Sequence, residues 1–469
     1  MLSSVFVFYS CSGDDEFVYE RWKLGKIVRS NINGSQYLFN TPTDGVTYSL
    51  SSRNSTIQPS FGTIDANGMV KDIQFFDEDG ELVNNTPQPP IVHGMVNVGD
   101  FVICGITLFQ DVEQERVNSE GEVVDDESEI LWRRMSLVYN LLINKKTGIV
   151  YMLPDEGGSF YPTSYNQLIS WIYGVTGYSD ANGNLYLGYR GHNSKTKISK
   201  INIQDSDNIS IEDYLPASEM DNLVFYYDEN LEFSVNPSGV CAYKTYGSVG
   251  EKLKCPGGRI YPIEQLIPDD ALGASGFYYH LFMGHNGSYY IATSTGSVIT
   301  IYKLLEPTNN EILSEQVAEL ASESYYGSQI RYSVKNPEKG THIWSLGNKL
   351  VEFSERENTI INTTIEIPTI QSDTHLFYAS GMLYIGNNGF QRLTQISFND
   401  YSDQKNVDFQ SNGYEAYNII SSMSPELTFT GLRYTDANYV VGIVDAAGNI
   451  NSLESTAQVN EKTILIRMN

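Results

Sequence analysis

One segment recurs along this chain, and its recurrence limits the folds that the chain can adopt. Each copy has Gly, one variable residue, an apolar-Tyr-apolar triplet, a short turn and a second apolar strand. The clear copies are NGNLYLGYRGHNSKTKISKINI at 182–203, NGSYYIATSTGSVITIYKL at 286–304 and SGMLYIGNNGFQRLTQISF at 380–398. Weaker copies are VGDFVICGITL at 98–108, PSGVCAYKTYG at 237–247, GTHIWSLGNKLVEFS at 340–354 and PELTFTGLRYTDANYVVGIV at 425–444. Successive cores fall about 40–60 residues apart, apart from one longer gap.

A period of this length, filled with about four short strands and few helical patterns, predicts the blades of a β-propeller. Seven repeats run from about 90 to 457, and the segment 35–83 carries strand patterns for one more. We therefore expect an all-β propeller of four-stranded antiparallel blades, with eight blades favoured over seven. The final TILIRMN at 463–469 is a single strand that we expect to pair with N-terminal strands.

Doubled tyrosines favour this fold over a β-sandwich. The pairs are Tyr226-Tyr227, Tyr278-Tyr279, Tyr289-Tyr290 and Tyr325-Tyr326. Consecutive residues of a strand point to opposite faces, so a sheet with one wet face would expose one ring of each pair. A blade is covered on both faces and can bury both rings. Glycines in DANG at 65–68 and 180–183, and in DAAG at 445–448, suit hairpin turns that need positive φ.

Charge and composition exclude several classes of protein. The net charge of −27 opposes binding to nucleic acid, which needs clustered Lys and Arg. No run approaches the 18 consecutive apolar residues of a membrane-spanning helix. The longer gap between repeats holds nine acids and one base between Asp111 and Glu129, so we expect an acidic loop insert at 110–131.

Four cysteines have different expected roles. Cys104 lies in the apolar run FVICGITL and is expected in the core. Cys241 and Cys255 flank AYKTYGSVGEKLK, which resembles a hairpin. The sequence is compatible either with a disulfide between them or with two buried thiols. We take the disulfide between Cys241 and Cys255 as the prediction. The fourth, Cys11, is considered below.

Motifs of known chemistry are absent from the sequence. There is no G-x-S-x-G, no H-E-x-x-H and no G-x-G-x-x-G. His280 and His285 are five residues apart, which places them on opposite faces of one strand, so we predict no metal site there. FFDEDGEL at 75–82 lacks the glutamate that ends a calcium loop and indicates an acidic hairpin turn. We therefore expect no cofactor, no metal and no catalytic residue.

Basic and aromatic residues that follow a repeat core are the candidates for ligand binding, because propeller ligands sit at one mouth of the central channel. The candidates are Arg190, His192, His285, Asn286, Arg331, Trp344 and Arg433. Arginines at equivalent blade positions of an acidic chain indicate an anionic ligand, unless each one pairs with a nearby carboxylate. We expect Arg190, Arg331 and Arg433 to converge near the propeller axis.

The N-terminal stretch VFVFYSCSGDDE contains a short apolar run, a small residue, Cys11 and then three acids at 14–16. This order resembles the lipobox and acidic export tag of Bacteroidota lipoproteins, and GLRYTD with VVGIVDAAGNI near the end is similar to their β-propeller members. The resemblance implies lipidation of Cys11 and an outer-membrane location at the cell surface or the periplasmic face. The expected organisation is a residual signal and lipobox at 1–11, an acidic flexible tether at 12–30 and a single propeller domain at 31–469.

The function we expect is non-catalytic binding of a glycan or another nutrient-derived ligand by a lipid-anchored monomer. One alternative is a propeller enzyme, either a polysaccharide lyase or a glycosidase, that acts at the channel mouth. Another is a scaffold that docks to an outer-membrane uptake receptor. An anionic small ligand is a further possible partner, and we expect no binding of nucleic acid. We expect the protein to contact the membrane only through the lipid anchor.

Replacing Cys11 with Ala tests the anchor. Acyl chains on this cysteine would hold the chain in a bilayer at about 0.8 kcal/mol per buried methylene. We expect the wild-type chain to sediment with membranes and the Cys11→Ala chain to appear in the soluble fraction after cell fractionation. A variant that stays with the membranes would show that the anchor is wrong.

Overall fold

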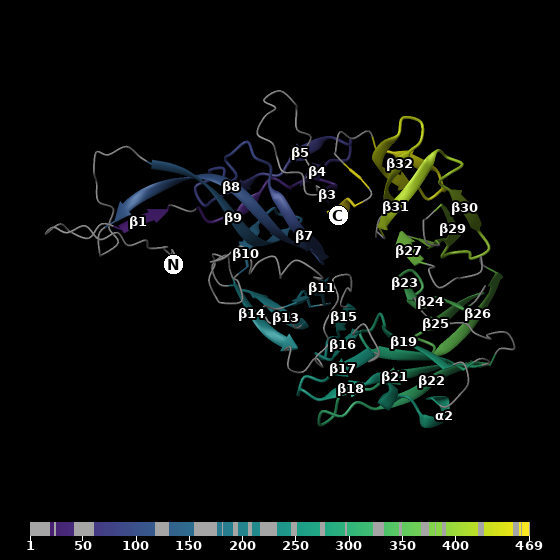
Figure 1. Ribbon diagram of the computed structural model, residues 1–469. Helices are drawn as coiled ribbons and strands as arrows, with labels where there is room; N and C mark the ends of the chain where they lie inside the picture. Colours follow the sequence, from purple (N-terminus) through teal and green to yellow (C-terminus); the bar gives the residue numbers. More distant parts are fainter. Residues whose placement is uncertain are drawn as a thin grey trace. The chain divides into compact units, whose positions relative to one another are not determined.

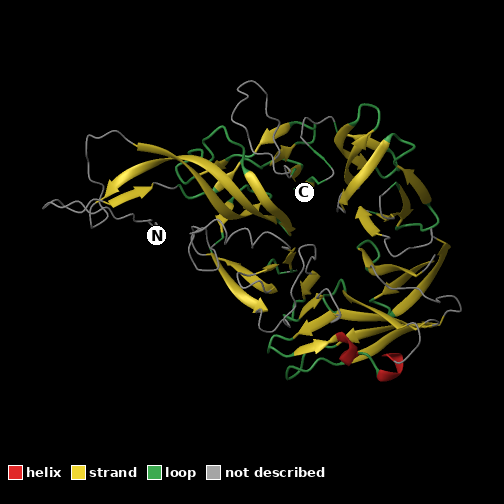
Figure 2. Ribbon diagram, viewed as in Figure 1, coloured by secondary structure: helices red, strands yellow, loops and turns green. Residues whose placement is uncertain are grey.

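The computed structural model has an all-β fold of short antiparallel sheets (Figures 1 and 2). It describes residues 19–22, 25–41, 61–117, 131–153, 176–180, 182–190, 196–204, 209–215, 232–244, 251–272, 277–295, 298–321, 333–346, 349–366, 375–379, 381–386, 391–420, 426–453, 459–460 and 462–468. The chain divides into two compact units, which are described separately. Unit 1 comprises Met1–Ser179, Asn184–Asn230 and Ile466–Asn469, and unit 2 comprises Asp180–Gly183 and Leu231–Leu465.

Eight antiparallel sheets in the described residues are the blades of a β-propeller; seven have four strands, and one has a fifth strand added to its four. Three of them involve unit 1. The first contains β7 (Ile91–Val98), β8 (Phe101–Val117), β9 (Leu131–Asn144) and β10 (Val150–Met152). The second contains β11 (Thr176–Ser179), β12 (Leu185–Arg190), β13 (Thr196–Ile203) and β14 (Ile209–Leu215). The third contains β35 (Ile464–Arg467), β3 (Tyr37–Asn40), β4 (Phe61–Ile64) and β5 (Val70–Asp72).

Unit 2 contains the other five blades. Their strands, in order, are β15 (Glu232–Val235), β16 (Cys241–Lys244), β17 (Glu251–Lys254) and β18 (Ile260–Pro262); β19 (Phe277–Met283), β20 (Tyr289–Thr295), β21 (Val298–Leu304) and β22 (Ser314–Ala321); β23 (Ser333–Asn336), β24 (Thr341–Leu346), β25 (Lys349–Ser354) and β26 (Thr359–Glu366); β27 (His375–Ala379), β28 (Met382–Gly386), β29 (Arg392–Ser397) and β30 (Gln404–Asp408); β31 (Tyr414–Ile420), β32 (Leu427–Arg433), β33 (Asn438–Val444) and β34 (Ile450–Ser452).

The predicted number of blades is confirmed. The seven repeats correspond to the seven sheets from β7 to β34, and the segment 35–83 supplies β3, β4 and β5. The strand predicted at the end of the chain is β35, which pairs with β3 as expected. Helix is limited in the described residues to η1 (Ile263–Leu266) and α2 (Asp269–Leu272), drawn red in Figure 2. Neither has the length and apolar character needed to span a membrane.

Two segments that we expected to be irregular contain strands. Within the predicted tether at 12–30, β1 (Tyr19–Trp22) pairs with the far end of β8, and β2 (Arg29–Ser30) pairs with β6 (Phe75–Phe76). Within the predicted loop at 110–131, β8 continues to Val117 and remains paired with β9 as far as Leu131. The hydrogen bonds between β8 and β9 join backbone groups and do not depend on the side chains, so the pairing continues into the acidic sequence. Residues 118–130 lie outside the described part.

The predicted turns agree with the structure. Gly68, Gly183 and Gly448 have φ of +80°, +79° and +85°. Asp65 Oδ1 accepts hydrogen bonds from the backbone N–H groups of Asn67 and Met69, and Asp445 Oδ1 accepts from those of Ala447 and Asn449. The carboxylate thus accepts hydrogen bonds from the backbone N–H groups of the turn. Glycine occupies the turn position that needs a positive φ. Asp77 makes the same contacts with Asp79 and Glu81, so FFDEDGEL is a hairpin turn as expected.

Strand β20 shows how a blade buries both faces. Tyr289 and Tyr290 are consecutive, and their exposed fractions are 2% and 1%. Tyr289 packs with Leu253 of β17 in one apolar cluster, whereas Tyr290 packs with Val351 and Phe353 of β25 in another. The sheet β19–β22 is therefore packed on one side against β15–β18 and on the other against β23–β26. The argument from doubled tyrosines is confirmed for this pair.

The predicted disulfide is wrong, and the strand register explains why. Cys241 of β16 lies opposite Lys254, so Cys255 belongs to the other face of the sheet. Cys255 packs in the apolar cluster that contains Leu253, and Cys241 is not part of it. Thiols on opposite faces cannot be bridged without movement of the backbone. Both are buried free thiols, and Cys104 is a buried core residue as expected.

Thiol mapping under non-reducing conditions tests this arrangement. Burial raises the pKa of the Cys241 thiol to about 12, so the folded protein should react slowly with an alkylating reagent. After denaturation without reductant, we expect mass spectrometry to find Cys241 and Cys255 both fully alkylated. A peptide pair linked through these residues would contradict the register of β16 and β17.

Candidate functional site

Only part of the predicted binding set can be placed. Arg190 is the last residue of β12 and Trp344 lies in β24, but their side chains are outside the described part of the structure. His192 and Arg331 lie outside the described residues altogether. The predicted convergence of Arg190, Arg331 and Arg433 is therefore untested. His285, Asn286 and Arg433 are described.

Arg433 makes contacts within its own blade. Its Nε and Nη2 donate to the two carboxylate oxygens of Asp436 at 3.0 and 2.6 Å, and its Nη1 donates to Ser452 Oγ at 2.9 Å. The paired guanidinium lowers the pKa of Asp436, mainly through these hydrogen bonds. This is the local pairing that we expected of a structural arginine.

The same blade, β31–β34, also carries exposed aromatic rings. Tyr434 and Tyr439 are 47% and 41% exposed. The Tyr417 and Tyr439 rings contact each other, with centroids 6.0 Å apart and planes inclined at 38°. The pairing of β31 with β32 shifts between Ala416 and Asn418, which makes Tyr417 the extra residue of a β-bulge. Bulges redirect a side chain and often lie next to binding sites.

A polar side chain lies beside these rings. The Tyr417 hydroxyl donates to Glu415 Oε2 at 3.3 Å. Asn438 lies opposite Arg433 in the register of β32 and β33, so its side chain belongs to the other face of the sheet from Tyr439, and its Nδ2 donates to Asp436 Oδ2 at 2.8 Å there. We call Tyr417 and Tyr439, with Glu415, the tyrosine surface. It combines two aromatic rings with a carboxylate that a hydrogen bond holds in place.

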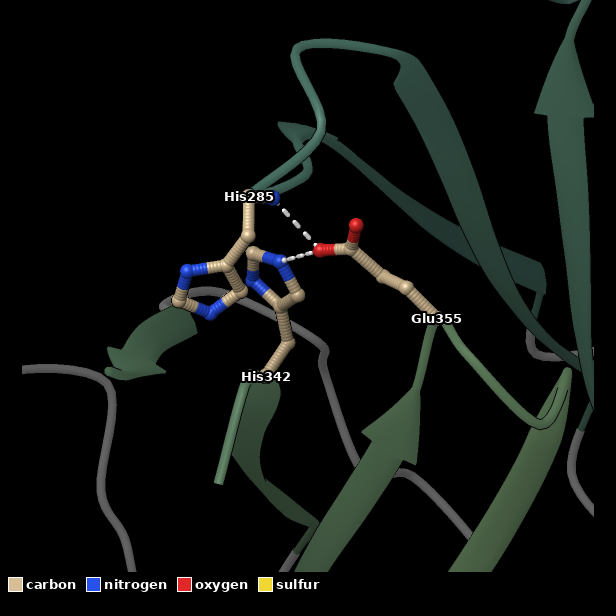
Figure 3. A group of neighbouring side chains, drawn as sticks. All are labelled: His285, His342 and Glu355. Carbon is tan, nitrogen blue, oxygen red and sulfur yellow. Dashed lines mark hydrogen bonds and ion pairs between the residues drawn. The ribbon is translucent and has the colours of Figure 1, made fainter. Parts of the chain in front are cut away.

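A second group of functional side chains lies between blades β19–β22 and β23–β26. Figure 3 shows His285, from the turn after β19, beside His342 of β24 and Glu355, which follows β25. Each residue offers one ligand atom, and these three atoms lie within 4.8 Å of one another. We call these three residues the histidine cluster.

Glu355 holds the cluster together. Its Oε1 accepts from the backbone N–H of His285 at 2.6 Å and contacts Nε2 of His342 at 2.7 Å, while its Oε2 accepts from the backbone N–H of Asn286 at 3.3 Å. Burial acts to raise the pKa of Glu355, but these hydrogen bonds outweigh it and lower the pKa. The carboxylate is therefore ionised at neutral pH.

His342 is nearly inaccessible. Its side chain is 1% exposed and packs on Phe282, with ring centroids 4.7 Å apart. Burial lowers the pKa of His342, although Glu355 acts to raise it, so the imidazole is neutral at pH 7. A neutral ring that donates to Glu355 carries its proton on Nε2, which leaves a lone pair on Nδ1. That Nδ1 is buried and has no hydrogen-bond partner among the described residues.

The turn that carries His285 fits closely against Glu355. A Cβ atom on Gly284 would lie 2.7–2.8 Å from the carboxylate atoms of Glu355, so only glycine allows this approach. His285 itself is exposed, and its Nε2 lies 3.1 Å from the carbonyl oxygen of Thr341. Asn286 Nδ2 donates to the Tyr290 hydroxyl at 3.2 Å. Asn286 contacts the histidine cluster through its backbone N–H, which donates to Glu355.

Sequence reasoning missed His342 and Glu355. It paired His285 with His280, and the structure instead brings His285 to residues of the next blade. Glu355 lies 13 positions from His342 and 70 positions from His285. No fixed spacing marks such a set, although each histidine lies within two residues of a glycine, Gly284 or Gly340.

No protein-family model matches this chain. No curated protein sequence matches it either. Solved structures with a similar fold include catalytically inactive virginiamycin B lyase from Staphylococcus aureus with quinupristin, at 15% identity and TM-score 0.35 over 61% of this chain and 85% of that one. A protein from Lactobacillus plantarum has 10% identity and TM-score 0.32 over 92% and 99% of the two chains. Oligopeptidase B from Trypanosoma brucei has 11% identity and TM-score 0.37 over 79% and 49%. Likenesses at this level concern the fold alone.

The role of Glu355 can be measured through stability. Glu355→Ala leaves two backbone donors and the imidazole of His342 without their acceptor, so we expect the free energy of unfolding to fall by about 2–4 kcal/mol. Glu355→Gln, which keeps an acceptor oxygen, should cost less. The control is Glu357→Ala at an exposed turn position, which should change stability by no more than about 0.5 kcal/mol in chemical denaturation. Equal effects of Glu355→Ala and Glu357→Ala would show that the hydrogen bonds of Glu355 do not stabilise the fold.

Proposed function

We propose that this chain is a non-catalytic binding protein for a neutral glycan, and that the tyrosine surface is its binding site. The observation that carries the proposal is the contact between two partly exposed rings at a β-bulge, Tyr417 and Tyr439. In a packed blade, large aromatic side chains are normally buried. Two that meet at the surface leave apolar area available to a ligand.

The chemistry of the tyrosine surface suits a sugar. The C–H face of a pyranose ring packs flat on an aromatic ring, and its hydroxyls need donors and acceptors at the edge. Glu415 provides a carboxylate beside Tyr417 that a hydrogen bond already holds in place. Fixed polar groups lose little conformational entropy when a ligand binds.

The charges favour a neutral ligand over an anionic one. The guanidinium of Arg433 is paired with both oxygens of Asp436, so it is not available to a carboxylate or sulfate of a ligand. Glu415 adds negative charge beside Tyr417, and the whole chain has a net charge of −27. An acidic glycan would be repelled.

The proposed setting is the bacterial outer membrane, at the cell surface or on the periplasmic face, with a lipid anchor on Cys11. The order of apolar residues, serine, Cys11 and acids supports this setting. A binding propeller held there would collect glycan beside an uptake receptor. We propose that the protein also docks to such a receptor, through surface outside the tyrosine surface.

Binding to an array of neutral and acidic oligosaccharides tests the function. We expect the wild-type chain to bind a subset of neutral glycans, and Tyr417→Ala combined with Tyr439→Ala to lose binding at least about tenfold, since each lost stacking contact is worth about 1 kcal/mol. Tyr439→Phe keeps the ring and should retain most binding. Leu313→Ala, at a 62% exposed position on another blade, is the control.

Two results would contradict the proposal. One is the absence of binding to every glycan on the array. The other is binding that the double tyrosine variant leaves unchanged, which would place the ligand elsewhere. Thermal unfolding of each variant checks that a loss of binding does not follow from unfolding.

A further inference from the structure

We propose that the histidine cluster is a binding site for a divalent first-row transition-metal ion such as Zn²⁺, with His285, His342 and Glu355 as its three protein ligands. The proposal is independent of the glycan site, which lies on another blade of unit 2. It rests on the ligand types, on their spacing and on the way in which the surrounding backbone holds them.

The donor set selects a class of metal. Two imidazoles and one carboxylate supply two nitrogen ligands and one oxygen ligand, the combination that zinc takes where it keeps an open position. Mg²⁺ and Ca²⁺ prefer oxygen ligands only and fit this set poorly. The three candidate atoms already lie within 4.8 Å of one another, so no large movement of the backbone is needed to bring them together.

The carboxylate is held in place before a metal arrives. Backbone N–H groups of His285 and Asn286 donate to its two oxygens, which fixes the carboxylate against the turn that carries His285. Such contacts between ligands and their surroundings commonly orient metal sites. The closeness of Gly284 to the carboxylate keeps this turn in position.

His342 has a ring nitrogen that the fold leaves unused. Its buried Nδ1 has no hydrogen-bond partner among the residues that the structure describes. A nitrogen lone pair in that position costs free energy unless something binds it or its ring turns. A metal ion bound to Nδ1 would use the lone pair that has no hydrogen-bond partner among the described residues.

Metal binding needs a small local adjustment. Ligand atoms of a tetrahedral zinc site are about 3.3 Å apart, given bond lengths near 2.0–2.1 Å. The present separation of 2.7 Å between His342 Nε2 and Glu355 Oε1 is a hydrogen bond, so it must lengthen or the ring must present its other nitrogen. His285 is exposed and can rotate. Three protein ligands then leave a coordination position for water on the solvent side.

The imidazole of His285 distinguishes a metal site from a purely structural clamp. The clamp uses only the backbone N–H of His285, which any residue except proline provides. Among the described residues, the exposed ring makes its polar contact with the carbonyl of Thr341. A structural role therefore predicts that replacing the ring has no effect on metal content, whereas a metal site requires the ring.

The test is zinc binding by tag-free, full-length protein after removal of metal with a chelator. We expect one Zn²⁺ per chain in isothermal titration calorimetry, and a rise in melting temperature when zinc is added. His285→Ala and Glu355→Gln should each weaken zinc binding at least about 100-fold and abolish the rise. His280→Ala removes an imidazole of the same blade outside the cluster and is the matched control, with zinc affinity unchanged.

Cobalt provides a second measurement that does not depend on stability. Co²⁺ bound by the wild-type cluster should give a visible d–d absorption band that zinc displaces, and the band should be missing in His285→Ala. The proposal is overturned if the wild-type chain takes up no stoichiometric zinc. It is equally overturned if His285→Ala and Glu355→Gln bind zinc as the wild type does.

Discussion

Each described blade must bury two faces, and this constraint governs the rest of the structure. In β20 it explains why Tyr289 and Tyr290 can be consecutive and yet both inaccessible, since a different neighbouring sheet covers each ring. A sheet packed on both sides leaves little room for polar groups in its interior. Recognition chemistry is therefore confined to turns, bulges and the edges where two blades meet.

Both proposed sites follow from that confinement. Tyr417 reaches the surface because a bulge takes it out of the regular pairing of β31 with β32. Glu355 and His342 are buried at the junction of two blades, where the carboxylate compensates for its burial with two backbone donors and an imidazole. A charged group in such a place needs these partners, because an unpaired buried charge would cost several kcal/mol.

The fold could be predicted from the sequence because repeats, turn glycines and doubled tyrosines are local patterns that report two-sided burial. The sites could not, because they depend on which strands become neighbours. The contact of His285 with Glu355 joins residues 70 positions apart, and the faces of Cys241 and Cys255 depend on a hairpin register that spacing alone does not give. The pairing of Arg433 with Asp436 was within reach of sequence reasoning, since it joins residues three positions apart beside one turn.

The central claim is that the polar junction between β19–β22 and β23–β26 binds a ligand and does not serve packing alone. Diffraction data collected at the zinc absorption edge, from crystals grown with zinc, test it most directly. The account predicts one strong anomalous peak within bonding distance of His285, His342 and Glu355. An ordered cluster without a peak, with Glu355 still hydrogen-bonded to His342, would contradict it and leave Glu355 as a structural clamp (Figure 3).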